Sequence, residues 1–431
     1  MLGCRPGSAG TVRRSVRRGR QGRGCGRVGE RVGERVEGAV AGTRRVRPGG
    51  GSSRPAGRRA QILLLAADLF HRGGYHQVTM AEVAGGLGIT APALYRHFRG
   101  KPELLHQVVG SGLDALAEAL APARGTAELC AALSTVAIDH RPLGTLWQRD
   151  ARLLPPGQRA RLRRELRADV RLMAGVLRAD RPDLPQADAE LLCWSALSVY
   201  GGLSHHGFTP PRRRFERLLR DIGAALLAVP LVGARVEPTV LADPGAARPG
   251  QRREELLVAA VRLFHERGFD NVSTDQLGAA VGMSGPSVYH HFDSKAALLA
   301  ASLVRGRERL RQETEAAVTG AARADAALAA GLRAYIGFAR RHSHYLGAML
   351  SETERLAPPD RRTAVEFRRD FLRTWVGLLR QVRPEYDAAE ARIRVHSMFA
   401  LVNDGVRNRP HSERADLGDC LERMARAVLG L

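Results

Sequence analysis

Hydrophobic residues recur at helical spacing along most of the chain that follows residue 57. From Arg58 to His71, apolar residues fall on one face at a period of about 3.6 residues. They are Ile62, Leu65, Ala66, Leu69 and Phe70. Gly73 and Gly74 follow at once. Because glycine commonly ends helices, the pattern predicts a helix that stops there.

The same pattern returns from Arg252 to Arg267, and Gly268 ends it. Its apolar face consists of Leu256, Leu257, Ala260, Leu263 and Phe264. Tyr75 and Phe269 follow the two segments as matched aromatic residues. No segment shows a strand's alternation of apolar and polar residues strongly enough to predict a sheet. An all-α fold is therefore predicted.

A second, shorter helix is predicted after each of these segments. Thr79 with Glu82, and Ser273 with Gln276, have the three-residue spacing of a capping box. In that motif the side chain of the first residue accepts a hydrogen bond from the backbone amide of the second. The side chain of the second residue accepts one from the backbone amide of the first. Both helices are expected to end at a glycine, Gly88 in one and Gly282 in the other.

A third helix is predicted after each glycine. Thr90 and Ser284 can cap it, and Pro92 and Pro286 suit its first turn. The result is a helix, a tight glycine-containing turn and a helix, which is the helix-turn-helix layout.

These units are two copies of one sequence. Lys101 and Lys295, the only lysines in the chain, are offset by 194 residues, the difference between their numbers. The likeness extends to Arg181-Pro182 and Arg383-Pro384, where the offset has grown to 202, the difference between 182 and 384. A period near 200 residues indicates duplication of a domain rather than a solenoid.

The predicted organisation has four parts. They are a disordered tail at residues 1–57, a first copy at 58–229, a linker at 230–250 and a second copy at 251–431. In the first copy a helix-turn-helix (HTH) unit at 58–101 precedes a helical body at 102–229. In the second copy an HTH unit at 251–295 precedes a body at 296–431.

The net charge of the chain indicates the class of molecule that it binds. The chain carries a formal net charge of +23 and a pI near 11.2, which favours nucleic acid or acidic lipid. Residues 1–57 hold fourteen arginines against three glutamates, with almost no aromatic residue. Such a composition cannot order a core. This tail either adds non-specific affinity for nucleic acid or is an upstream extension from a wrongly assigned start codon.

The cysteine and hydropathy patterns indicate the cellular compartment in which the protein is expected. The five cysteines are scattered and form no CxxC pair, which fits a reducing cytoplasm. No run approaches the length of about 18 apolar residues that a membrane helix needs. A cytoplasmic, nucleoid-associated protein without a membrane partner is expected.

In both copies the residues resemble the tetracycline-repressor (TetR) family of bacterial transcription regulators. The shared signature is a first helix ending in Phe, then Gly-aromatic, a Thr or Ser opening the second helix, and Tyr-x-His-Phe followed by Lys. The resemblance implies two tandem TetR-like domains, each with an HTH unit and a helical body for ligand binding and dimerisation. The tandem layout resembles double-TetR regulators of actinobacterial lipid or steroid operons.

The resemblance also implies which residues bind DNA, through a short recognition helix in the major groove. Facing the bases would be Thr90, Ala91 and Ala93 in one copy and Ser284, Gly285 and Ser287 in the other. Phosphate contacts are implied for Tyr95, His97, Tyr289 and His291, and for Lys101 and Lys295 at a helix start that favours anions. Arg96 and His290 can reach base or backbone, and Thr79 and Ser273 complete the set.

In the family the last two helices of the body pair across a dimer interface. The matching segments are 187–208 with 212–229, and 388–407 with 414–429. Here the two pairs can meet within one chain, as an intramolecular pseudo-dimer, because the tether gives an effective concentration up to about millimolar. Further self-association of chains is left open.

Aromatic residues and one methionine are candidates for the wall of a ligand cavity. They are Trp147, Trp194, Tyr200, Tyr335, Phe338, Met349 and Trp375. Packing in the core is the alternative for each of them. Because few charged residues accompany them, an apolar effector is expected, such as a lipid, an acyl compound or a steroid-like molecule.

Neither a cofactor nor a metal is expected. His205 with His206, and His342 with His344, have spacings that cannot place both rings on one helix face. No motif of a hydrolase, zinc protease or nucleotide-binding enzyme occurs, so enzymatic activity is not expected.

The function hypothesis is a ligand-responsive repressor that reads an asymmetric operator with two different recognition helices. Two alternatives remain. Only one copy reads DNA and the other is a structural partner, or the arginine-rich tail drives non-specific binding.

Overall fold

The structure is a computed structural model that describes residues 57–231, 233, 251–407 and 411–431. The predicted tail, apart from Gly57, and nearly all of the predicted linker lie outside these residues. Within the described ranges every regular element is helical and no strand is present, as the sequence predicted.

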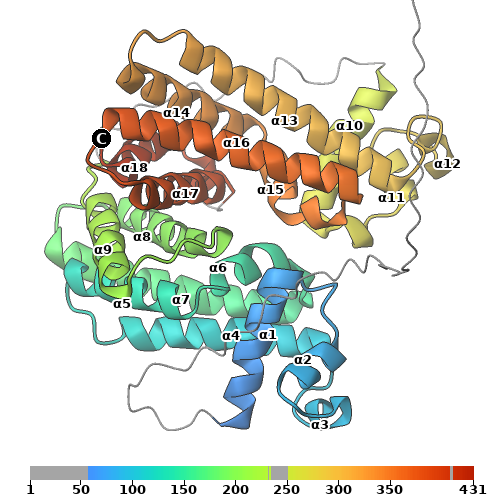
Figure 1. Cartoon of the computed structure of the whole chain (residues 1–431), viewed down its shortest axis with the longest axis horizontal. Coiled ribbons are helices and arrows are strands. Elements are labelled where there is room, and N and C mark those ends of the chain that lie inside the picture. The colour runs from blue at the N-terminus through green and yellow to red at the C-terminus, as the bar shows by residue number, and fades with distance from the viewer. Residues whose placement is uncertain (1–56, 232, 234–250, 408–410) are drawn as a thin grey trace, which may run out of the picture. The chain divides into compact units, whose positions relative to one another are not determined.

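Helices of the first copy occupy the blue to green part of Figure 1. They are α1 (Arg58–Gly73), α2 (Met80–Gly86), α3 (Ala91–Tyr95), α4 (Lys101–Leu120), α5 (Thr126–Asp139), α6 (Leu143–Thr145), η1 (Leu146–Asp150), η2 (Ala151–Leu153), α7 (Pro156–Asp180), α8 (Gln186–Gly201), η3 (Gly202–His205) and α9 (Arg212–Leu227).

The second copy repeats this order, with an added short turn, η4, after its first helix and a single helix, α15, in place of α6 and η1. Its elements are α10 (Arg252–Arg267), η4 (Phe269–Asn271), α11 (Thr274–Ala279), α12 (Gly285–Val288), α13 (Lys295–Thr319), α14 (Ala324–Arg341), α15 (Ser343–Ser351), η5 (Thr353–Arg355), α16 (Pro358–Val382), α17 (Ala388–Gly405), η6 (His411–Glu413) and α18 (Leu417–Leu429).

The predicted stops of the first helices are confirmed. Gly74 follows α1 with φ of 77°, and Gly268 follows α10 with φ of 82°. These left-handed backbone angles are easy for glycine and strained for residues with a Cβ. The second helices end earlier than predicted, at Gly86 and Ala279, because Gly88 and Gly282 already have positive φ and belong to the turn.

The third helices begin as predicted but without the expected hydroxyl caps. Pro92 and Pro286 lie in the first turns of α3 and α12. Thr90 and Ser284 hold the extended cap position, yet neither side chain makes a capping hydrogen bond. Ser284 Oγ instead lies 2.7 Å from Ser287 Oγ.

The ends of the two copies pack against each other inside one compact unit, Pro55–Leu431. Helices α8 and α9 lie beside α17 and α18 (Figure 1). Gly202 comes so near α17 that a Cβ at this position would lie 2.6 Å from Ala400 Cβ. The predicted segment 187–208 ran too far as a single helix, since α8 gives way to the 3-10 turn η3.

Buried side chains divide unequally between the copies. One continuous core joins the first HTH unit, the first body and much of the second body. The second HTH unit has a separate core, built around Phe264, Val288 and Phe292. The first HTH unit is therefore fused to the bodies, whereas the second packs largely within itself.

No helix among the described residues combines the length and the apolar composition that crossing a bilayer requires.

Candidate nucleic-acid interface

Two tyrosines at matched positions are exposed at the ends of the third helices. Tyr95 is 52% exposed and Tyr289 is 53% exposed. The residue before each tyrosine is buried, since Leu94 and Val288 lie in the two HTH cores. A single exposed aromatic ring is ordinary on a protein surface, but nearly equal exposure at the same position of both copies is a feature that the two units share.

The other predicted DNA-binding residues, apart from Gly285, are exposed or partly buried. Thr90, Arg96 and His97 are exposed in the first copy, as are Ser284 and His290 in the second. The partly buried members are Ala91, Ala93, Ser287, His291, Lys101 and Lys295. Within each HTH unit the predicted residues lie on the third helix, beside its two ends, and at the starts of the helices before and after it.

Gly285 differs from the rest of the set because it is buried. A Cβ there would lie 1.8 Å from Asp275 Oδ1 on α11. The missing side chain is thus required by the packing of α12 on α11. A contact between this residue and DNA stays a prediction.

The two predicted capping boxes are confirmed. Thr79 Oγ1 accepts from the Glu82 amide at 3.1 Å, and Ser273 Oγ accepts from the Gln276 amide at 3.1 Å. The return bonds, from the Thr79 and Ser273 amides to the Glu82 and Gln276 side chains, are also present. These hydroxyls fix the start of the second helices.

The two lysines hold the loop between the first and second helices. Lys101 Nζ donates to His76 O at 3.1 Å and lies 4.5 Å from the Tyr75 ring centre. Lys295 Nζ donates to Phe269 O and Val272 O, each at 2.9 Å, and lies 4.3 Å from the Phe269 ring centre. A phosphate contact by either ammonium stays a prediction, and it would be made by a group that already has partners.

Paired arginines at the start of each first helix also brace the unit. Arg58 Nη2 donates to Leu87 O at 3.2 Å, and Arg252 Nη1 donates to Val281 O at 2.7 Å. The next residue stacks on a core phenylalanine in each copy, with Arg59 over Phe98 and Arg253 over Phe292. These matched contacts set the first helix against the turn that precedes the recognition helix.

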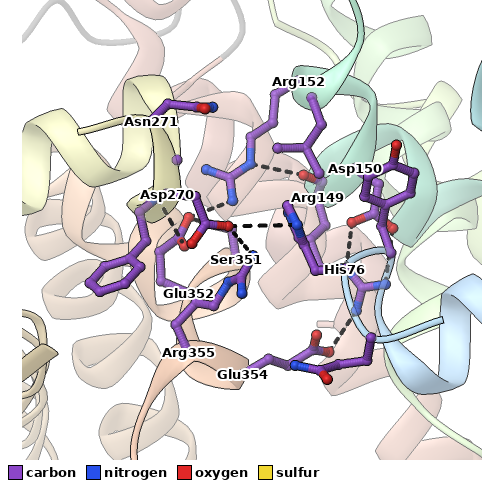
Figure 2. Close-up of a pocket in the computed structure, with 15 residues that line it drawn as sticks. His76, Arg149, Asp150, Arg152, Asp270, Asn271, Ser351, Glu352, Glu354 and Arg355 are labelled. Carbon is purple, nitrogen blue, oxygen red and sulfur yellow. Dashed lines mark hydrogen bonds and ion pairs between the residues drawn. The ribbon is translucent and has the colours of Figure 1, made fainter. Parts of the chain in front are cut away.

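The HTH units meet at a network of charged residues, the junction network, drawn in Figure 2. Its members are His76, Arg149, Asp150, Arg152, Asp270, Glu352, Glu354 and Arg355. It comes from the loops after α1 and α10 and from η1, η2 and η5, and it surrounds a small cavity of about 30 Å³.

Arginines of the first body reach both HTH units. Arg149 donates to Phe70 O at the end of α1, at 2.7 Å, and pairs with Glu354 at 2.8 Å. Arg152 donates to the carbonyls of Phe264 and His265 at the end of α10, at 3.3 Å each. Cations suit helix C-termini, where the carbonyl ends of the backbone dipoles gather.

Acidic residues of the second copy complete the network. Glu352 is 2% exposed and pairs with Arg152, and Asp270 pairs with Arg355. His76 Nδ1, from the first HTH unit, lies 3.6 Å from Asp270 Oδ2 of the second. Burial, followed by Arg355, lowers the pKa of His76. The orientations of the two HTH units are therefore tied to one set of ion pairs.

Comparison with known proteins places both HTH units in one family. The family model described as bacterial regulatory proteins, tetR family, matches residues 62–108 and 256–302. The HTH-type transcriptional repressor KstR2 of Rhodococcus jostii is 31% identical over 146 residues, which cover 32% of this chain and 71% of that protein. The chain belongs to the tetR family.

Other members of this family match over shorter stretches. The HTH-type transcriptional activator FasR of Mycolicibacterium smegmatis is 38% identical over 78 residues, which cover 15% of this tetR-family chain and 36% of FasR. The match to KstR2 of the same organism covers 30% of that protein, so the chain spans about a third of these two relatives. The solved structure of ketosteroid transcriptional regulator KstR2 of Mycobacterium tuberculosis aligns with a TM-score of 0.39 and 22% identity, over 43% of this chain and 96% of that one.

The predicted ligand-binding residues of this tetR-family chain occur mainly in packed surroundings. Tyr200 is buried and donates to Leu219 O at 3.0 Å, and a Cβ on Gly223 would collide with its hydroxyl. Tyr335 donates to Asn403 Oδ1 at 2.6 Å. Trp375 and Phe338 are also buried, whereas Trp147, Trp194 and Met349 are partly buried.

Two cavities are described, and neither is lined by any of these seven residues. One is the junction cavity, and the other lies along the start of α7. The ligand role of the seven stays a prediction. Within the described residues, no group of three or more His, Cys, Asp or Glu side chains is arranged to hold a metal ion.

The junction network was not predicted from the sequence. Its acidic partners come from segments far away in sequence, which no local pattern connects.

Proposed function

We propose that this chain is a DNA-binding transcription regulator that reads DNA with both HTH units. The matched exposure of Tyr95 and Tyr289 carries this proposal. Each tyrosine follows a residue of the buried core, and in each unit a capping box fixes the start of the preceding helix, α2 or α11. Relatives described as transcriptional activators and repressors support the same activity.

The two readers are proposed to act as a single-chain pseudo-dimer. Support comes from the packing of α8 and α9 on α17 and α18, including the close approach of Gly202 to Ala400. Polar contacts also cross this interface. Gln148 donates to Asp404 at 2.6 Å, and Arg414 pairs with Asp188 at 2.7 Å.

The operator is proposed to be asymmetric, since the surfaces that face the groove differ. The first copy presents Ala93 and Arg96 where the second presents Ser287 and His290. Alanine contacts a thymine methyl, whereas serine exchanges hydrogen bonds with base edges. The regulator is further proposed to be a repressor released by an apolar effector.

Operator stoichiometry and footprinting test this proposal. Native mass spectrometry of the complex should show one chain for each operator, and footprinting should show two unlike half-sites. A palindrome bound by two chains would contradict the pseudo-dimer. Loss of binding after Tyr95→Ala alone, with Tyr289→Ala unaffected, would show a single reader. Deletion of residues 1–57 should only weaken binding and flatten its salt dependence.

A further inference from the structure

A second cavity lies along the first turns of α7, outside both HTH units. It measures about 450 Å³ and is lined by Arg152, Leu154, Pro156, Arg159, Ala160, Arg163, Arg164 and Arg167. Its volume falls within the range of roughly 300–1,000 Å³ that is typical of small-molecule sites. No acidic residue belongs to its lining.

Four of its arginines lack a counter-charge. Among the described residues, Arg159, Arg163, Arg164 and Arg167 take part in no ion pair, although many other arginines of the chain do. Burial, followed by Arg163 and Arg152, lowers the pKa of Arg159. Burial, followed by Arg167, lowers the pKa of Arg163. Like charges are thus held together at a cost in free energy that an anion would remove.

The cluster is only partly repeated in the second copy. Helix α7 (Pro156–Asp180) corresponds to α16 (Pro358–Val382) at an offset of 202, the difference between 156 and 358. At this offset Arg163 and Arg164 correspond to Val365 and Glu366, whereas Arg159 and Arg167 correspond to Arg361 and Arg369. A helix surface in this fold therefore does not require arginine at positions 163 and 164.

We infer that this cavity binds a small soluble polyanion that carries two or more phosphate groups. Guanidinium groups bind phosphate oxygens through paired N–H donors, and several of them here line a hollow rather than a projecting ridge. A hollow of this volume fits a compact ligand better than the backbone of a DNA duplex.

Occupancy would reach the second reader through one residue. Arg152 lines the cavity and also donates to the Phe264 and His265 carbonyls at the end of α10. A polyanion beside Arg152 competes with Glu352 and with those carbonyls for the same guanidinium. By linkage, if the polyanion changes the affinity for DNA by some factor, DNA changes the affinity for the polyanion by the same factor. The binding site itself does not depend on the proposed function.

Calorimetric titration of the full chain with inorganic tripolyphosphate tests the inference. Wild type should bind one equivalent, and bind it more tightly than it binds inorganic phosphate. The variant Arg163→Glu with Arg167→Asp reverses two of the charges that line the cavity. It should bind at least roughly tenfold more weakly. The control Arg171→Glu with Arg213→Asp changes the net charge equally at exposed arginines outside the cavity, and should bind as wild type does.

Thermal unfolding gives a second readout that does not need tight binding. Without ligand the cavity variant should melt at or above the wild-type temperature, because repulsion is relieved, and tripolyphosphate should raise its melting temperature less than that of wild type. Absence of saturable binding to wild type, or equal weakening in the control, would overturn the inference. So would a cavity variant that keeps tripolyphosphate affinity but loses operator affinity, since the arginines would then belong to the DNA interface.

Discussion

The rings of His206 and His396 lie 4.8 Å apart where the first body meets α17 of the second. His206 is buried, and its Nδ1 lies 2.9 Å from Arg141 Nη2, which donates to it. A ring nitrogen that accepts from a guanidinium has to be unprotonated. Burial, then His396 and Arg141, lowers the pKa of His206 to about 2, and burial and nearby arginines lower that of His396 to about 4.

Acid should therefore weaken the contact between the copies. In the unfolded chain these imidazoles gain protons near their ordinary pKa of about 6.5, whereas the folded protein resists protonation. The unfolded state then binds more protons, so stability is lost as pH falls below about 6.5. For His206 alone the loss between pH 7 and pH 5 is about 2 kcal/mol. Urea unfolding at several pH values measures it.

A glutamine at His396 should flatten this pH dependence. The charged groups that face the pair are Arg141, Arg368 and Arg392, and they remain in the variant. His290→Gln removes an exposed imidazole on α12's flank and serves as the control. Equal slopes in wild type and His396→Gln would show that this histidine does not contribute.

Removing Arg152 should destabilise the junction more than removing its ion pair as a whole. Arg152→Met leaves Glu352, which is 2% exposed, without its counter-charge, at a cost of about 3 kcal/mol. The double variant with Glu352→Met should recover much of that loss. Denaturant unfolding of both variants gives the comparison. An additive pair of losses would mean that the two side chains do not interact in solution.

The exposed tyrosines should act on DNA affinity and not on stability. Tyr95→Phe and Tyr289→Phe each remove one hydroxyl that is proposed to donate to phosphate, and each should weaken operator binding by roughly fivefold. Because both rings are about half exposed, melting temperatures should not change. Fluorescence anisotropy with labelled operator measures the affinity. Unchanged affinity in both variants would argue against the phosphate role.

Lysine substitutions distinguish a loop contact from a phosphate contact. Lys295 has two carbonyl partners and Lys101 has one, so Lys295→Met should cost about 1 kcal/mol of stability and Lys101→Met less. Both should weaken DNA binding without a change in preferred sequence. If affinity falls while stability is kept, the ammonium groups act on phosphate rather than on the loop.

The glycine pair in α2 offers a stabilising change. A Cβ on Gly85 meets no atom within 4 Å, whereas one on Gly86 would lie 2.7 Å from Leu65 Cδ2. Gly85→Ala should stabilise the chain by about 1 kcal/mol, since alanine is the better helix former. Gly86→Ala should gain less or lose, because Leu65 has to move. Thermal unfolding of the two variants compares them directly.

The helices of the HTH units were predicted well because capping boxes and glycine stops involve only residues that are close in sequence. A capping box needs only Thr79 and Glu82 three residues apart, and a helix stop needs only Gly268 in the right place. Helix ends in the bodies were predicted less well. The predicted helix 187–208 changes to η3 where Gly202 approaches Ala400, a contact that sequence periodicity cannot contain.

Residue roles were harder to predict than elements. Lysine at a helix start predicted a phosphate contact, and the fold also places an aromatic ring and at least one backbone carbonyl beside each ammonium. The aromatic residues predicted for a ligand wall line neither described cavity. A side chain's type shows which chemistry is available, and its neighbours in space decide which part is used.

The sequence by itself determined an all-α chain with two capped HTH units, because helix periodicity, capping and glycine stops act within a few residues. Tertiary structure decided how those units are joined. It placed Arg149 and Arg152 at the ends of α1 and α10, and it gave the second HTH unit its own core. Each of these depends on contacts between residues far apart in the chain, and burial then fixes which charges stay paired.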